Sequence, residues 1–208
     1  MRVVQDLHER GFNPGTAGNA SVRFADGMII TPSGVPYPTL APRELVEMSL
    51  DGAAQGTLKP SSEWRFHVDI YRARPEVGAI VHLHAAYASA YASLRRDLPA
   101  FHYMIAVAGG PTIRCAPYAT FGTQQLSNNV VAALEDRTAC LLANHGIVAV
   151  GETPEAAAEL AAEVEILCEM YTHALQAGSP VILTEAEMAE VLARFADYGN
   201  PGRSRRLD

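Results

Sequence analysis

Lysine is nearly missing from the sequence. Lys59 is the only lysine among the 208 residues, so the other cationic side chains, apart from histidine, are arginines. A Schiff-base mechanism would depend wholly on Lys59, and the turn around it offers no evident apolar pocket to activate an amine. If the protein performs carbonyl chemistry, we therefore expect it to use a Lewis acid.

Cysteine and long apolar runs are also scarce. Cys115, Cys140 and Cys168 lie far apart without a Cys-x-x-Cys spacing, and an odd, sparse set suits a reducing compartment better than a disulfide framework. The N-terminal segment MRVVQDLHER has no apolar h-region, which a signal peptide would need. No run approaches the ~20 apolar residues of a membrane helix. We expect a cytoplasmic protein with no membrane partner.

The sequence lacks a basic face and internal boundaries. The formal net charge is -7, and the basic residues are scattered. Because nucleic-acid binding needs a basic surface, we expect no nucleic-acid partner. The densest basic run, Arg203–Arg206, lies within a tail of about residues 199–208 that we expect to be flexible. No repeat, low-complexity tract or linker divides the chain, so one domain over residues 1–208 is expected.

The first half of the chain shows a hairpin, a short strand and a helix. Residues 21–24 and 28–31 form two short apolar segments joined across Asp26-Gly27, a strong hairpin signal. The segment APRELVEMSL predicts a short helix and a strand. The segment PSSEWRFHVDIYRARP predicts a helix that Ser61 or Ser62 caps, with Glu63 in its first turn.

The second half alternates buried strands with helices. AIVHLHA predicts a buried strand and AYASAYASLRR a helix, while CLLANHGIVAVG predicts a strand or strand pair interrupted at residues 144–146. Thr153-Pro154 opens a long helix to about Ala177. Thr184 and Glu187 predict a capping box for a last helix to about Ala196. The pattern indicates an α/β domain with a mostly antiparallel or mixed sheet and helices on both faces.

Two histidines stand one residue apart at the end of the AIVHLHA segment. On a strand, His82 and His84 point to the same side, which is the geometry that two ligands of one metal ion require. Two ordinary polar residues at a strand end would show the same spacing. His-x-His alone leaves both interpretations open.

A third histidine favours the metal. His145 interrupts a buried apolar segment, and such a polar break is costly unless the side chains have partners. The adjacent Gly146 permits a bulge or close backbone approach. Three imidazoles with an open fourth position are typical of catalytic zinc, whereas structural zinc uses cysteines, and none lies near a histidine here. Two other enzyme classes with a His-x-His motif fit less well. In a metallo-β-lactamase the motif continues into an Asp-His pair, which is not present after His84. An amidohydrolase barrel needs ~250 residues, more than this chain has.

Three turns rich in small residues precede the histidines. The turn Pro60–Glu63 supplies two hydroxyls and the start of a helix, which can bind an anion such as phosphate. Residues 15–19 and 31–34 form the other two. Each is most often ordinary turn chemistry, and Glu63 alone would most often only complement the helix dipole. Together they suggest a phosphorylated substrate.

With these segments, the chain resembles the class II aldolase/adducin family and, within it, the bacterial L-fuculose-1-phosphate aldolases. The resemblance extends over almost the whole length. It rests on the blocks GTAGNASVR, ITPSGVPY, PSSEWRFH, AIVHLHA, HYMIAVAGG, CAPYATFGT, NHGIVAVG and FADYG. It implies a three-layer α/β/α sandwich around a mostly antiparallel sheet, assembled as a homotetramer with sites at subunit interfaces.

The resemblance also implies roles for individual residues. Zn²⁺, or Mn²⁺ or Co²⁺ in its place, would be held by His82, His84, His145 and Glu63, and Glu63 would then serve as acid/base. Tyr103 matches a proton-donating tyrosine that enters a neighbouring subunit's site, and Tyr198 a C-terminal tyrosine that closes over substrate. The residues that match the phosphate pocket are Thr16, Asn19, Ser33, Gly34, Ser61 and Ser62.

The implied reaction is cleavage of a ketose 1-phosphate into dihydroxyacetone phosphate and an aldehyde. The substrate would be L-fuculose 1-phosphate or a related 5-deoxyketose 1-phosphate, such as 5-methylthioribulose or 5-deoxyribulose 1-phosphate. Alternatives are an L-ribulose-5-phosphate 4-epimerase, a decarboxylase of sugar-acid phosphates, and a non-catalytic adducin-like module. Asn144 stands where the fuculose-phosphate enzymes have histidine, the family's long first helix is nearly absent, and the tail differs. These departures bear on which aldehyde is released and leave the expected reaction unchanged.

Overall fold

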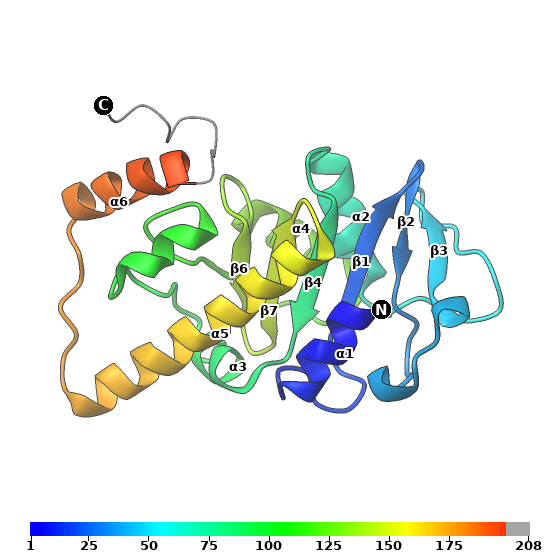
Figure 1. Ribbon diagram of the computed structural model, residues 1–208, viewed down its shortest axis with the longest axis horizontal. Coiled ribbons are helices and arrows are strands. Elements are labelled where there is room, and N and C mark those ends of the chain that lie inside the picture. The colour runs from blue at the N-terminus through cyan, green and yellow to red at the C-terminus, as the bar shows by residue number, and fades with distance from the viewer. Residues whose placement is uncertain (199–208) are drawn as a thin grey trace, which may run out of the picture.

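The computed structural model describes residues 1–198, with the backbone alone for residues 196–198. Its strands form one seven-stranded sheet in the order β3-β2-β1-β4-β7-β6-β5, shown in Figure 1. The strands are β1 (Asn19–Phe24), β2 (Gly27–Ile30), β3 (Val46–Ser49), β4 (Ala79–Leu83), β5 (Cys115–Ala116), β6 (Ala139–Leu142) and β7 (Gly146–Gly151). Only the β5–β6 pair among them is parallel, so the predicted mostly antiparallel sheet is confirmed.

Helices cover both faces of the sheet. The α-helices are α1 (Arg2–Glu9), α2 (Trp64–Ala73), α3 (Ala86–Ala92), α4 (Gln124–Ala133), α5 (Pro154–Ala177) and α6 (Glu185–Tyr198), and the 3-10 helices are η1 (Tyr37–Thr39), η2 (Pro42–Glu44) and η3 (Tyr103–Ala108). In Figure 1, α5 crosses the near face of the sheet with α1 and α3 beside it, and α2 and α4 lie behind the sheet. The expected α/β/α sandwich is confirmed. Among residues 1–198, no helix combines the length and apolar character needed to cross a bilayer.

The central strand β4 is buried on both sides, and its alternation decides which way His82 faces. Ala79, Val81 and Leu83 pack in the core under α3 and α5. The intervening side chains face the layer that contains α2: Ile80 belongs to that second core, and the His82 ring lies 5.5 Å from the Phe66 ring, centroid to centroid. His82 therefore points toward the start of α2.

Most of the predicted local elements are confirmed within one or two residues. The hairpin pairs Phe24 with Gly27 across the predicted turn. The long helix is α5, where the Thr153 side chain accepts a hydrogen bond from the Ala156 N–H. The capping box also forms, since Thr184 N–H donates to the Glu187 carboxylate and Glu187 N–H donates back to Thr184 Oγ1.

The predicted cap of α2 is wrong. The helix begins at Trp64, and its N-cap is Glu63, not Ser61 or Ser62. Ser61 Oγ accepts instead from the Glu63 N–H, in the turn before the helix. Glu63 has φ -102° and ψ 14°, outside the α-helical values, and its carboxylate lies 3.1 Å from His82 Nε2. The sequence also did not predict α4 or η3.

Candidate metal centre and substrate cavity

The three histidines and Glu63 converge on one point. Each of the four side chains presents one ligand atom, and these atoms all lie within 4.8 Å of one another. His82 Nε2 is 2.9 Å from His84 Nε2 and 3.1 Å from Glu63 Oε2. His145 Nε2 is 3.4 Å from Glu63 Oε1. Every pair of imidazole rings has its centroids 4.8 Å apart, with the planes inclined by 74–79°.

The backbone brings His145 to this point through one tight turn. The turn between β6 and β7 places Asn144 at φ 55°, in the left-handed region that Asn tolerates. A Cβ on Gly146, two residues further along, would lie 2.1 Å from the carbonyl oxygen of Leu83. Only glycine lets β7 approach the end of β4 this closely. The close approach allowed by Gly146 is therefore what sets His145 beside His84.

The environment of His82 selects the nitrogen that faces the cluster. Its Nδ1 lies 2.7 Å from the carbonyl oxygen of Ile147, and a carbonyl can only accept, so Nδ1 carries the proton. The lone pair is then on Nε2, which points to the other ligands. A backbone carbonyl that fixes the tautomer is the usual support of a metal-binding histidine.

The charges of the four groups fit a cation between them. Burial, reinforced by His82, lowers the pKa of His84 and of His145 to about 4. Burial raises the pKa of the Glu63 carboxyl, but the neighbouring His82, His145 and His84 outweigh this effect and bring it to about 2. The neutral rings of His84 and His145 and the ionised Glu63 carboxylate thus face one another with lone pairs. Glu63 Oε1 is buried without a hydrogen-bond partner. A divalent transition metal matches this donor set.

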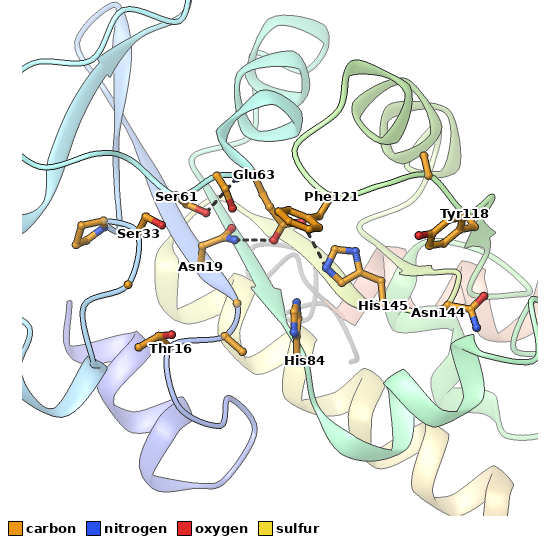
Figure 2. Close-up of a pocket in the computed structure, with 16 residues that line it drawn as sticks. Thr16, Asn19, Ser33, Ser61, Glu63, His84, Tyr118, Phe121, Asn144 and His145 are labelled. Carbon is orange, nitrogen blue, oxygen red and sulfur yellow. Dashed lines mark hydrogen bonds and ion pairs between the residues drawn. The ribbon is translucent and has the colours of Figure 1, made fainter.

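A cavity of about 400 Å³ opens beside the cluster. Figure 2 shows Thr16 and Ser33 at one end, Tyr118 and Asn144 at the other, and Glu63, His84 and His145 between them. The cavity wall includes all six residues that the sequence assigned to phosphate binding, namely Thr16, Asn19, Ser33, Gly34, Ser61 and Ser62. No Lys or Arg is among the described residues that line it. The six phosphate-binding roles stay predictions.

The hydroxyl-bearing turns are tied to one another by backbone contacts. Ser33 N–H donates to the Lys59 carbonyl, and Ser61 N–H donates to the Thr31 carbonyl, each at 3.0 Å. The hydroxyl of Tyr37 donates to the Gly18 carbonyl at 2.7 Å. These contacts hold the turns in place around an end of the cavity that offers N–H and O–H donors and, among residues 1–198, no cationic side chain.

Of the two tyrosines with predicted catalytic roles, only Tyr103 has a described side chain, and it does not line this cavity. Tyr103, at the start of η3, is 51% exposed and lines a separate hollow with Met104 and three residues of α6. The side chain of Tyr198 lies outside the described residues. Their roles stay predictions.

Some cavity residues were not singled out from the sequence. Tyr118 and Phe121 stand at the rim, with 54% and 64% of their surfaces exposed. Two aromatic residues in the Pro- and Gly-containing segment CAPYATFGT, whose composition predicts a loop, are the signal that could have indicated them. Inside the core, His67 is fully buried beside the site, and nothing in its sequence context marks it as different from an ordinary helix residue.

Comparisons with known proteins agree with this geometry. Residues 1–172 match the family model of the class II aldolase and adducin N-terminal domain. A protein of Rhodospirillum rubrum named 5-methylthioribulose-1-phosphate/5-deoxyribulose-1-phosphate aldolase is 53% identical, over 91% of this chain and 86% of its own length. The L-fuculose phosphate aldolase of Escherichia coli is 49% identical, over 93% of this chain and 91% of its own length.

A comparison of three-dimensional structures indicates the same family. A solved structure named L-fuculose 1-phosphate aldolase superposes with a TM-score of 0.90 at 40% identity, covering 94% of this chain and 93% of the other. The likeness thus extends over nearly the full length of both molecules, in sequence and in structure. The chain belongs to the class II aldolase and adducin family.

Proposed function

We propose that this chain is a metal-dependent aldolase that reversibly cleaves a ketose 1-phosphate into dihydroxyacetone phosphate and an aldehyde. The observation that carries the proposal is the cluster of His82, His84, His145 and Glu63 at the wall of a cavity whose one end consists of hydroxyl-bearing turns. A dianionic phosphate fits that end, because N–H and O–H groups can bind it. The positive charge it needs would come from the metal.

Zinc is the metal we propose, with Mn²⁺ or Co²⁺ as alternatives. The ligands would be the three imidazoles and, without substrate, the Glu63 carboxylate, a set typical of catalytic zinc. A metal ion bound there supplies a Lewis acid that stabilises negative charge on the carbonyl oxygen of the substrate.

Glu63 is the proposed acid/base. Its Oε1 is free of hydrogen bonds and the group is ionised, so it can accept a proton. In cleavage, Glu63 takes the proton of the C4 hydroxyl. The C3–C4 bond then breaks, and the electron pair of that bond moves toward the carbonyl group at C2. C4 leaves as the aldehyde, and a proton delivered to C3 completes dihydroxyacetone phosphate. The turns around Ser33 and Ser61 keep the phosphate, and thereby C3, in register with Glu63.

We also propose a homotetramer in which Tyr103 serves a neighbouring subunit. Tyr103 is half exposed and does not line the cavity of its own chain, which supports donation to another copy as the second proton carrier. Tyr198 is proposed to close over the substrate. The size-exclusion mass of the protein and the rate of a Tyr103→Phe variant, with substrate binding intact, test these points.

The identity of the aldehyde product determines which ketose 1-phosphate is the substrate. The two relatives above are named for L-fuculose phosphate and for 5-deoxypentulose phosphates, so we propose a substrate among these. The aromatic rim formed by Tyr118 and Phe121 suits an aldehyde with an apolar end, which favours 5-methylthioribulose or 5-deoxyribulose 1-phosphate as the second candidate beside L-fuculose 1-phosphate.

One experiment tests the reaction and ranks the substrates. Zinc-loaded protein is incubated with a panel of ketose 1-phosphates, and dihydroxyacetone phosphate release is coupled to a dehydrogenase. Release from at least one sugar is expected. A stoichiometrically loaded protein that cleaves none of them would overturn the proposal, and interconversion of ribulose 5-phosphate epimers without cleavage would replace it with the epimerase.

A further inference from the structure

A line of buried polar side chains runs from Glu63 into the core, away from the cavity. Asn19 Nδ2 donates to Glu63 Oε2 at 3.1 Å, and Asn19 Oδ1 lies 2.5 Å from His67 Nε2. On the other side of the ring, His67 Nδ1 is 2.7 Å from Ser21 Oγ, which lies 2.9 Å from the Tyr71 hydroxyl. All five residues are buried.

Two regular periodicities create this line. Asn19 and Ser21 are two apart on β1 and therefore face the same side of the sheet. His67 and Tyr71 follow Glu63, the N-cap of α2, at spacings of four, so the three side chains lie along one side of the helix. Where the strand face meets that side of the helix, the five side chains alternate between the two elements. Asn19 is also the direct partner of His82 in the β1–β4 ladder, which ties the line to the metal ligands.

The carboxylate fixes the direction of every hydrogen bond in the line. An ionised carboxylate only accepts, so Asn19 must present its N–H₂ to Glu63 and its carbonyl to His67. His67 must then donate from Nε2, which leaves Nδ1 as an acceptor for the Ser21 hydroxyl. The Ser21 hydroxyl donates its only proton to His67 and therefore accepts a hydrogen bond from the Tyr71 hydroxyl. Burial also keeps the His67 ring neutral, with a pKa of about 3, so it carries the one proton that the line requires.

We propose that His67 is a positioning residue for the acid/base carboxylate: it holds the Asn19 amide in the one orientation that presents an N–H to Glu63. This inference rests on the proposed function of Glu63. With the amide reversed, a carbonyl oxygen would face the carboxylate and push it out of place. The held carboxylate keeps one oxygen, Oε2, anchored to Asn19, while Oε1 is left for the metal and the substrate proton.

Two substitutions of His67 separate this role from simple packing. The amide nitrogen of Gln can occupy the place of Nε2 and still donate to Asn19, whereas Asn is one carbon shorter and reaches only the place of Nδ1. We expect His67→Gln to keep most of kcat. We expect His67→Asn to lose about 10–100-fold in kcat, the usual loss when a supporting hydrogen bond at such a site is removed, with KM for the ketose phosphate and the zinc content near wild type.

A matched control tests whether a loss of stability alone could explain a loss of kcat. Val68 is buried on the same helix and its apolar side chain takes no part in the hydrogen bonds of the line, so Val68→Ala should lower the melting temperature and leave kcat unchanged. Equal kcat in the Gln and Asn variants, or a kcat loss in Val68→Ala as large as in His67→Asn, would overturn the proposal.

A second measurement does not depend on activity. In zinc-loaded protein labelled with ¹⁵N-histidine, the ring-nitrogen shifts of His67, assigned by their loss in His67→Gln, should show a protonated Nε2 and a hydrogen-bonded, unprotonated Nδ1. A proton on Nδ1 would overturn the proposed line even in an active enzyme. If instead the expected tautomer is found but no ketose phosphate is cleaved, the proposed function fails and the orientation of the line stands.

Discussion

The two ends of the substrate cavity are built in opposite ways. At the metal end, His82 and Glu63 are buried, and hydrogen bonds to Ile147 and Asn19 fix the orientation of each. At the rim, Tyr118 and Phe121 expose more than half of their surfaces. The proposed metal ligands and acid/base are thus fixed within one chain, whereas the side chains that would meet the aldehyde remain free to adapt.

The rim has its own, weaker set of contacts. Arg95 Nε donates to Asn144 Oδ1 at 2.7 Å, and its guanidinium lies 5.5 Å from the centroid of the Tyr118 ring. Contacts of this kind between exposed side chains contribute little to stability. A buried end that tolerates no change and a rim that tolerates many would let the family keep one reaction while its members differ in aldehyde. Breaking each end in turn tests this contrast.

The largest effect is expected from removing a histidine of the cluster. His84→Ala removes one of the three imidazoles. Because Glu63 must leave the metal to act as acid/base, only two protein ligands would remain during turnover, fewer than the three of a catalytic zinc site. Zinc content, measured by mass spectrometry after dialysis, should fall below stoichiometric, and turnover should be lost. His173→Ala, which removes an exposed histidine on α5, is the control and should keep both. Full zinc content in His84→Ala would remove His84 from the centre.

Replacing the carboxylate should lower the rate without removing the metal. Glu63→Gln retains the shape of the side chain but cannot accept a proton, so kcat should fall about 10²–10⁴-fold, the range of general acid–base catalysis. Zinc content and phosphate binding should persist. Glu47→Gln on β3, an exposed position, should behave as wild type. Undiminished turnover of the Glu63 variant would assign the proton transfer to another group.

Changes at the rim should alter substrate choice by a smaller factor. Removing the Arg95 side chain (Arg95→Ala) frees Asn144 and Tyr118, and we expect the ratio of kcat/KM between two aldehydes in the condensation direction to change by about tenfold or less. KM for dihydroxyacetone phosphate should be unaffected. Ser33→Ala, at the opposite end, should show the reverse pattern. An equal effect of both variants on both substrates would end the distinction between the two regions.

A separate effect, on stability and not on activity, concerns the metal-free protein in acid. His84 and His145 have pKa values of about 4 when folded, against an ordinary value of 6.5. The unfolded chain therefore binds more protons between these pH values, and stability should fall as pH is lowered from about 6.5 to 4 and be unaffected by these groups above. The melting temperature after chelator treatment should decline over this window, and less in His84→Gln. A rise on acidification would contradict the shifts.

Local patterns in the sequence predicted much of this molecule. The Asp26-Gly27 hairpin, the Pro154 helix start and the Thr184 capping box depend on neighbours in the chain, so their signals are complete in the sequence. The same holds for His82 and His84, which the period of two along β4 puts on one side. The polar interruption at His145 was informative because burial makes such a break costly.

What could not be predicted depends on contacts between distant segments. His67 reads as an ordinary helix position, and only the placement of α2 against β1 makes it a partner of Asn19. Asn19 itself was assigned to the phosphate, while the structure also gives it a hydrogen bond to Glu63. The helix α4, with its sequence QQLSNNVVAA, was not predicted because its polar first half shows no clear period.

Because a short turn carries His145, binding of a metal would depend on the correct register of the central strands. Gly146 presses against Leu83, and β4 and β7 pair so that His82 lies opposite Val148. A slip of β7 by one residue would reverse every side chain on that strand and carry His145 away from His84. A chain with misaligned central strands could not assemble the three-histidine set, so zinc uptake would discriminate native sheets from misregistered ones during refolding.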